Sequence, residues 1–282
     1  MNTDEKFRNA YLVLAHEDVE MLNLLTKRLI NTGFVYIHLD LKSKIRVDQV
    51  IDHPQVKVFK KIKVNWGGFS IVEATRLLAD WAIEDGASRL TLLSGVSYPI
   101  VSDAKLKGFA ESSIECVDAG EVDLATQTKA FRRRFTTRHY SFHLKQNFYG
   151  RIIRRISREF WAMMPRLHPE KELGDLKLTL GSQWWSVPTS TYKNAMSLLI
   201  KNPRIEFYFK KIECSDESFF GTLFRFVSTN HTSQGTTYVK WADHGGPKGI
   251  QIADIQRERL AGKYTFVRKL NSTDQELLCI LI

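Results

Sequence analysis

Residues 11–15 read Tyr-Leu-Val-Leu-Ala, a short apolar run that predicts a buried β-strand. Similar patterns follow on its C-terminal side: a helix over 18–30, strands over 35–40 and 56–59, a helix from 70 to about 85, and a strand over 90–93. Strand, helix, strand, strand, helix and strand within a hundred residues are typical of an α/β protein with a nucleotide-binding half.

Polar residues follow three of these strands, namely His16, Asp40 and Ser94. Ligands of open α/β sheets bind beyond the carboxyl ends of the strands, so we expect a ligand site here. Trp66-Gly67-Gly68 precedes the helix that begins at Ser70. Two glycines before a helix let the backbone approach a phosphate or a sugar, although such a pair often makes only a turn.

Composition sets outer limits on the class of protein. With 43% hydrophobic and 26% charged residues, the 282-residue chain has ordinary globular values. Its three cysteines, Cys116, Cys214 and Cys279, are widely spaced, which argues against a disulfide framework or a zinc site and favours a reducing compartment. The sequence shows neither a signal peptide nor a membrane-spanning apolar run, so we expect a cytoplasmic protein.

The net charge of +10 is concentrated in one segment. Nine Lys or Arg and no Asp or Glu lie between Arg132 and Arg158; removing these nine from the 41 basic residues leaves 32 against 31 acidic ones. From Arg151 on, apolar residues keep helical spacing and arginines occupy the other face. A helix packed on the core is the favoured interpretation, and peripheral contact of 132–158 with an anionic membrane is the second. Nucleic acid is not an expected partner, because no known binding motif accompanies the charge.

Two later segments carry chemistry-bearing side chains. Residues 181–186 read Gly-Ser-Gln-Trp-Trp-Ser, and paired tryptophans beside polar residues suit sugar binding, although a core role is expected for one of the two. Residues 214–222 read Cys-Ser-Asp-Glu-Ser-Phe-Phe-Gly-Thr. Ser215 can cap a helix whose first turn contains Asp216 and Glu217, and this pattern alone favours a plain helix start.

Asp216-Glu217, followed by Thr222, resembles the S-P-D-E-x-x-x-x-T segment of the core-2/I-branching β-1,6-N-acetylglucosaminyltransferases and the related peptide O-xylosyltransferases. Cys214-Ser215 replaces the Ser-Pro of that family. Segments 11–16, 37–40, 66–74 and 92–100 stand in the order that the family shows, and so do Gly-Pro-Lys at 246–248 and Arg-Lys at 268–269. Residues 104–175 show no match. The resemblance suggests a bacterial-type member.

The resemblance implies an α/β, GT-A-like single domain over 1–282. It would comprise a Rossmann-like nucleotide-binding half (1–103), a basic variable region (104–175) and a smaller acceptor and catalytic half (176–282). By the same resemblance Glu217 is the catalytic base, and Lys269, assisted by Arg268 or Lys240, neutralises the donor diphosphate. The remaining implied residues are His16, Asp40, Trp66, Gly67 and Gly68 for the donor, and Ser182, Trp184 and Trp185 for the acceptor.

The sequence contains no Asp-x-Asp, the usual metal-binding motif of GT-A enzymes, so basic side chains are expected to offset the leaving-group charge and no metal or other cofactor is expected. The expected activity is inverting transfer of N-acetylglucosamine or xylose from a UDP-sugar to a glycan hydroxyl in cell-surface polysaccharide synthesis. A lipid-linked acceptor would suit peripheral membrane contact. A metal-dependent GT-A transferase and a non-catalytic sugar-nucleotide or membrane-binding module are the alternatives.

Overall fold

The computed structural model describes residues 8–139 and 148–281, apart from 229, 233 and 243–245. The strands are β1 (Asn9–Ala15), β2 (Phe34–Leu39), β3 (Val56–Phe59), β4 (Arg89–Ser94), β5 (Ser97–Pro99), β6 (Glu115–Glu121), β7 (Thr179–Pro188), β8 (His231–Thr232), β9 (Thr237–Val239) and β10 (Phe266–Arg268). The α-helices are α1 (Val19–Leu29), α2 (Ser70–Glu84), α3 (Asp103–Gly108), α4 (Lys129–Thr136), α5 (Phe148–Ala162), α6 (Pro169–Leu173), α7 (Thr189–Lys201), α8 (Pro203–Phe209), α9 (Phe219–Val227), α10 (Ile252–Ala261) and α11 (Gln275–Leu281). Short 3₁₀ turns are η2 (Val47–Gln49), η3 (Phe109–Glu111) and η4 (Ser215–Glu217).

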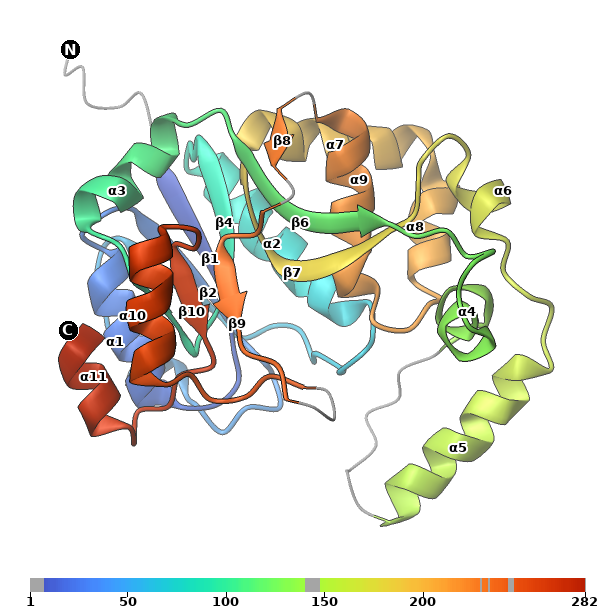
Figure 1. The fold of residues 1–282 in the computed structure, drawn as a ribbon, viewed down its shortest axis with the longest axis horizontal. Helices are drawn as coiled ribbons and strands as arrows, with labels where there is room; N and C mark the ends of the chain where they lie inside the picture. The colour runs from blue at the N-terminus through green and yellow to red at the C-terminus, as the bar shows by residue number, and fades with distance from the viewer. Residues whose placement is uncertain (1–7, 140–147, 229, 233, 243–245, 282) are drawn as a thin grey trace.

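A seven-stranded sheet in the order β3-β2-β1-β4-β7-β6-β8 forms the centre of the molecule (Figure 1). The first four of these strands are parallel, whereas β7 runs antiparallel to both β4 and β6. A second sheet has the order β5-β10-β9 and joins the first hundred residues to the last fifty. The central sheet therefore takes strands from each of the three segments that the sequence suggested.

Both faces of the central strands are buried, which explains their nearly continuous apolar sequences. Leu12 and Leu92 pack in the core that α2, α7 and α9 cover. Their neighbours Val13 and Leu93 belong to the opposite core, with α1. Alternate residues of a strand point to opposite faces, so helices on both sides are needed to remove these side chains from water.

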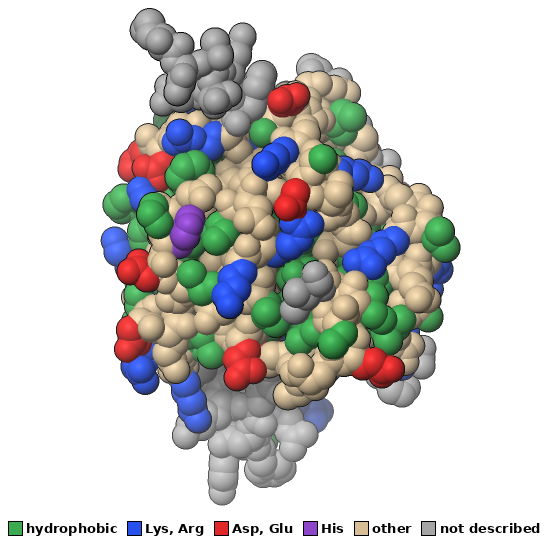
Figure 2. Space-filling view, turned by 90° about the vertical axis from the view of Figure 1, so that its left-hand side faces the viewer, with side chains coloured by type: hydrophobic (Ala, Val, Ile, Leu, Met, Phe, Trp, Pro, Cys, Tyr) green, Lys and Arg blue, Asp and Glu red, His purple; other side chains and the backbone are tan. Residues whose placement is uncertain are grey.

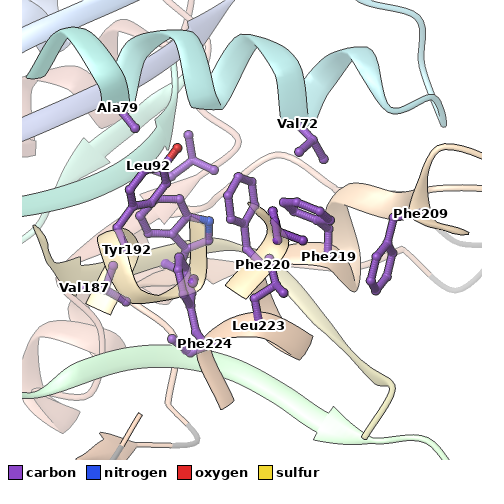
Figure 3. Close-up of a cluster of buried hydrophobic side chains, with 14 of the residues drawn as sticks. Val72, Ala79, Leu92, Val187, Tyr192, Phe209, Phe219, Phe220, Leu223 and Phe224 are labelled. Atoms are coloured by element: carbon purple, nitrogen blue, oxygen red, sulfur yellow. The ribbon is translucent and has the colours of Figure 1, made fainter. Parts of the chain in front are cut away.

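Aromatic side chains fill the core beneath α2 (Figure 3). The Trp185 ring lies 5.1 Å from Phe220 and 5.0 Å from Phe224, and Tyr192 stacks 6.5 Å from Phe220, measured between ring centroids. Such pairs stabilise a core through large buried areas and favourable ring geometry. This cluster fixes α9 against β7, and the η4 turn immediately precedes α9.

The structure confirms the predicted α/β class and the strands and helices of the first hundred residues. Two local expectations were wrong. Ser215–Glu217 forms the 3₁₀ turn η4 rather than the first turn of a helix, and α9 begins at Phe219. Four apolar side chains of α5, namely Ile152, Ile153, Ile156 and Phe160, are exposed rather than packed on the core. Among the described residues, no helix is long and apolar enough to cross a membrane.

Candidate active site

One cavity of about 590 Å³ opens where several strands end. In the parallel register, Ala15 of β1 lies opposite Leu39 of β2, and Leu14 lies opposite Ser94 of β4, so these three strands end at the same edge. Because β7 is antiparallel to β4, its beginning rather than its end lies at this edge. The walls of the cavity include His16, Asp40, Trp66, Gly67, Ser94, Ser182, Trp184, Cys214, Asp216, Glu217, Trp241, Arg268 and Lys269.

The side chains of His16, after β1, and Asp40, after β2, differ in their burial. The buried Asp40 carboxylate accepts hydrogen bonds from the backbone N–H groups of Lys42 (2.9 Å) and Val64 (3.2 Å), which fix its orientation. His16, in contrast, is exposed and has Nε2 3.8 Å from Oε1 of Glu17. His38 lies behind them, where burial lowers its pKa, and its Nε2 accepts from the Ile62 N–H, so it is the neutral imidazole.

The η4 turn is tied to the glycine loop. Gly67 has a φ of 72°, a left-handed conformation that favours glycine, and its carbonyl accepts a hydrogen bond from the Cys214 N–H (2.9 Å). Cys214 itself has a φ of 49°. An unusual backbone conformation at a non-glycine residue is typical of functional sites, where surrounding contacts maintain it. The loop of 65–68 and the η4 turn thus lie side by side in one wall of the cavity.

Glu217 forms an ion pair with Arg134 of α4, whose Nη2 lies 2.6 Å from Oε2 of the glutamate. Arg134 also donates to the carbonyls of Glu213 (3.3 Å) and Cys214 (3.2 Å), so it supports the turn as well as the carboxylate. Burial is the largest single influence on Arg134 and opposes its charge, but the hydrogen bond to Glu217 and the nearby negative charges together raise the pKa of the guanidinium. The Glu217 side chain remains 36% exposed and is therefore accessible from the cavity.

Asp216 and Glu217 have different environments. Burial raises the pKa of Asp216 to about 7, and the neighbouring charge of Glu217 adds to the effect. Burial also raises the pKa of the Cys214 thiol to about 12, with a contribution from Asp216. Neighbouring carboxyl groups whose environments separate their protonation states are a recurrent feature of acid and base catalysis. Glu217, which is paired with Arg134 and lines the cavity, is the better placed of the two to meet a substrate.

We expect Asp216→Asn to remove part of the pH dependence of stability. The folded-state pKa of Asp216, about 7, exceeds its ordinary value of 3.8, so the folded protein binds this proton more tightly than the unfolded chain does. The free energy of unfolding of the natural protein should therefore fall as the pH rises from about 4 to about 7, by up to about 4 kcal/mol from this group.

Urea denaturation of the two proteins at several pH values measures this difference. The introduced asparagine stays neutral, so the variant should be the more stable protein at pH 8, and the gap should narrow toward pH 4. A gap that is constant with pH would contradict the raised pKa.

Two basic residues lie at the end of β10. Nζ of Lys269 is 2.5 Å from Oε1 of Glu17, and this hydrogen bond lowers the pKa of Glu17. The Arg268 guanidinium lies 5.0 Å from the centre of the Trp184 ring, and its buried Nε has no hydrogen-bond partner within the described part of the chain. Burial lowers the pKa of Arg268. An unpaired buried donor and a lysine with one acidic partner are suited to an anionic ligand.

Three predicted site residues do not line the cavity. Gly68 is buried, and its N–H donates to the Asn65 carbonyl within the loop. Lys240 instead bonds Gln251 (2.9 Å) and Asp254 (2.8 Å) of the α10 region. Trp185 belongs to the aromatic core, so its expected acceptor contact is corrected: neighbouring residues of β7 face opposite ways, and Trp184 alone of the pair lines the cavity.

We expect the buried Trp185 and the exposed Trp66 to differ strongly in their contribution to the free energy of unfolding. Trp185→Ala should lower the free energy of unfolding by about 3–5 kcal/mol, because it leaves a cavity among Tyr192, Phe220 and Phe224. Trp66→Ala is the matched control, since Trp66 is 80% exposed and should change stability by less than about 0.5 kcal/mol. Urea denaturation tests both; equal losses would contradict the assignment of Trp185 to the core.

Sequence reasoning missed Arg134, Glu17 and the role of Trp241. Arg134 is one of nine basic residues in its segment, and neither its spacing nor its neighbours distinguished it before the fold placed α4 beside η4. Trp241 lines the cavity and is 64% exposed. An exposed ring of this size indicates a binding role, and its exposure can be seen only in the structure. Within the described residues, no three His, Cys, Asp or Glu side chains come together in a metal-ligand group.

The sequence matches the Core-2/I-Branching enzyme family over residues 9–262. The protein is therefore a glycosyltransferase, an enzyme that uses a sugar-nucleotide donor and a glycan acceptor. It belongs to the Core-2/I-branching enzyme family. The match includes Glu217 and ends before Arg268 and Lys269, so the placement of these two at the site rests on the cavity geometry.

None of the curated proteins matches the chain. Among solved structures, the chain is similar to a 4-diphosphocytidyl-2C-methyl-D-erythritol synthase, with 11% identity over 90% of this chain and 98% of that one and a TM-score of 0.41. It is also similar to a putative glucose-1-phosphate thymidylyltransferase from Bacillus anthracis in complex with sucrose, with 12% identity, coverage of 72% and 83%, and a TM-score of 0.33. At such TM-scores, the fold assignment rests on the strand order itself.

Proposed function

We infer that this glycosyltransferase is an inverting, metal-independent enzyme. It moves N-acetylglucosamine or xylose from a UDP-sugar to a hydroxyl of a glycan acceptor, in cell-surface polysaccharide synthesis. The observation that carries the proposal is the single cavity in which Glu217, the strand-end residues His16 and Asp40, and the basic pair Arg268 and Lys269 meet. A base, a donor edge and leaving-group stabilisation are the three elements that such a transfer requires.

The donor lies at the carboxyl edge of the parallel strands. Asp40, held by two backbone N–H groups, can accept hydrogen bonds from the nucleoside, and His16 is exposed beside it. Arg268 and Lys269 approach the same cavity from β10. When the UDP diphosphate leaves, negative charge develops on it, and these cations stabilise that charge. Glu17 holds Lys269 in place before the diphosphate binds.

Glu217 acts as the general base. Its carboxylate takes the proton from the acceptor hydroxyl as that oxygen attacks the anomeric carbon on the face opposite the departing UDP. Arg134 donates to Oε2, which orients the carboxylate. Among the described side chains no donor binds Oε1, so this oxygen can receive the acceptor proton.

The acceptor binds among aromatic side chains of the same cavity. Trp184 and Ser182 come from the start of β7, and the exposed Trp241 lies after β9. Aromatic rings stack on the apolar faces of sugar rings, while polar neighbours bind hydroxyl groups. Trp66, the other exposed tryptophan of the cavity, borders the donor side in this arrangement.

Release of UDP from a panel of UDP-sugars, with EDTA or with manganese, tests the proposal. Release from one sugar that EDTA does not diminish is the expected result, and it identifies the donor. Release only with manganese would contradict the metal-independent mechanism and support a metal-dependent transferase. If no sugar is hydrolysed, UDP binding is measured by calorimetry; absence of binding would contradict the donor site.

A further inference from the structure

We propose that α5 and the turn after it form an in-plane docking surface for bilayers that contain anionic lipids. The apolar residues of this surface are exposed: Ile156 by 64%, Phe160 by 54% and Met163 by 86%. Ile152, Ile156 and Phe160 recur at intervals of four residues, which places them along one stripe of α5, and Met163 follows three residues later in the turn after the helix. Single exposed apolar residues are ordinary, but a continuous stripe of them indicates an interaction site.

The surface lies on an excursion from the body of the protein. The chain leaves α4 at Thr136 and returns at Leu167, and the Leu167 N–H donates to the Thr136 carbonyl (2.8 Å). Figure 1 shows α5 at the lower right edge of the molecule, apart from both sheets. The core of the domain therefore does not cover the stripe.

The charge of this segment selects the partner. The sequence between Arg132 and Arg158 holds nine basic residues and no acidic one, and it accounts for nearly all of the net charge of +10. On the side of α1 and α11, in contrast, acidic and basic side chains are interspersed (Figure 2). Arg132 and Arg133 of α4 and Arg155 of α5 are exposed. A surface with both an apolar stripe and concentrated positive charge complements an anionic membrane. The acyl chains would contact the apolar stripe, and the anionic headgroups would contact the basic side chains.

Two other partners fit less well. A nucleic acid would neutralise the arginines but leave isoleucine and methionine side chains in water, since bases stack on aromatic rings. A second copy of the chain would cover the stripe but bring two strongly basic segments together. An anionic bilayer satisfies both features at once. It would also hold the chain near a membrane-embedded substrate, because α4, which carries Arg134 at the active site, directly precedes this excursion.

Cosedimentation of the full chain with vesicles tests the proposal and needs neither donor nor acceptor, so its outcome is independent of the proposed transfer reaction. Phosphatidylcholine vesicles with one-third phosphatidylglycerol should bind the protein at least about tenfold more tightly than phosphatidylcholine alone, and high salt should weaken the binding. The double variant Ile156→Glu/Phe160→Glu should lose at least about tenfold in partitioning.

The matched control is Ile200→Glu/Leu260→Glu, which replaces two exposed apolar residues on α7 and α10 and should bind as the natural protein does. Met163→Glu is a second variant, beyond the end of α5, and should weaken binding even if the double variant does not fold. Equal vesicle binding by all proteins, or no binding of the natural protein to anionic vesicles, would overturn the proposal. The proposal would also be overturned if light scattering showed that the natural protein is a dimer and that Ile156→Glu/Phe160→Glu is not, while neither protein binds vesicles.

Discussion

Replacing Glu217 by Gln is expected to lower the rate of sugar transfer by about 10²–10⁴-fold, the range that general-base catalysis contributes. Gln has nearly the same shape and can still accept a hydrogen bond from Arg134, but it cannot take the acceptor proton. UDP binding should be nearly unchanged, because Glu217 lies on the acceptor side of the donor in our proposal. Single-turnover transfer and UDP calorimetry measure the two effects separately.

Glu213→Gln is the matched control, since Glu213 precedes the same turn but is absent from the cavity wall. It should retain transfer at nearly the natural rate. Full turnover in the Glu217 variant would remove this residue from the role of base. Equal losses in both variants would point to a disturbed turn rather than to lost proton transfer.

Lys269→Gln is expected to lower the transfer rate by about 10²–10³-fold, which is typical of removing one group that stabilises developing charge. Its ammonium lies in the cavity with Arg268, and its ion-pair partner among the described residues is Glu17. The diphosphate gains negative charge as the sugar departs, so the loss should be larger in the rate than in UDP affinity.

Lys240→Gln provides the comparison, because Lys240 is engaged with Asp254 and Gln251 outside the cavity. We expect its transfer rate to stay close to the natural one. A larger loss for Lys240 than for Lys269 would reverse the assignment of the diphosphate contact. If the Lys269 variant kept the natural transfer rate and EDTA abolished its activity, the diphosphate contact would instead be assigned to a metal.

The first hundred residues were predictable because their order is local. Runs of four to seven apolar residues, such as 11–15 and 90–93, separated by helical periodicity and glycine, reflect strands buried on both faces and helices that cover them. The strand ends at His16, Asp40 and Ser94 followed from the same pattern, since parallel strands end at a common edge. The structure places all three in one cavity.

The start of α9 was predicted less well. Ser215, Asp216 and Glu217 are good residues for a helix start, but the backbone of Cys214 is left-handed and bonds Gly67, which holds the three residues in a separate 3₁₀ turn. A tertiary contact here outweighed local propensity. The difference matters for function, because the turn rather than the helix carries the candidate base.

The sequence by itself determined the α/β class, the edge at which we expect ligands to bind and the choice of Glu217 as candidate base, because periodicity, strand ends and a family motif are properties of short segments. Only the tertiary structure decided which tryptophan of residues 184 and 185 lines the cavity, and that Arg134 pairs with Glu217 although 83 positions separate them. It also decided that the apolar stripe of α5 is exposed. Each of these depends on which surfaces meet when distant segments pack, and packing between distant segments leaves no periodic signal in the chain.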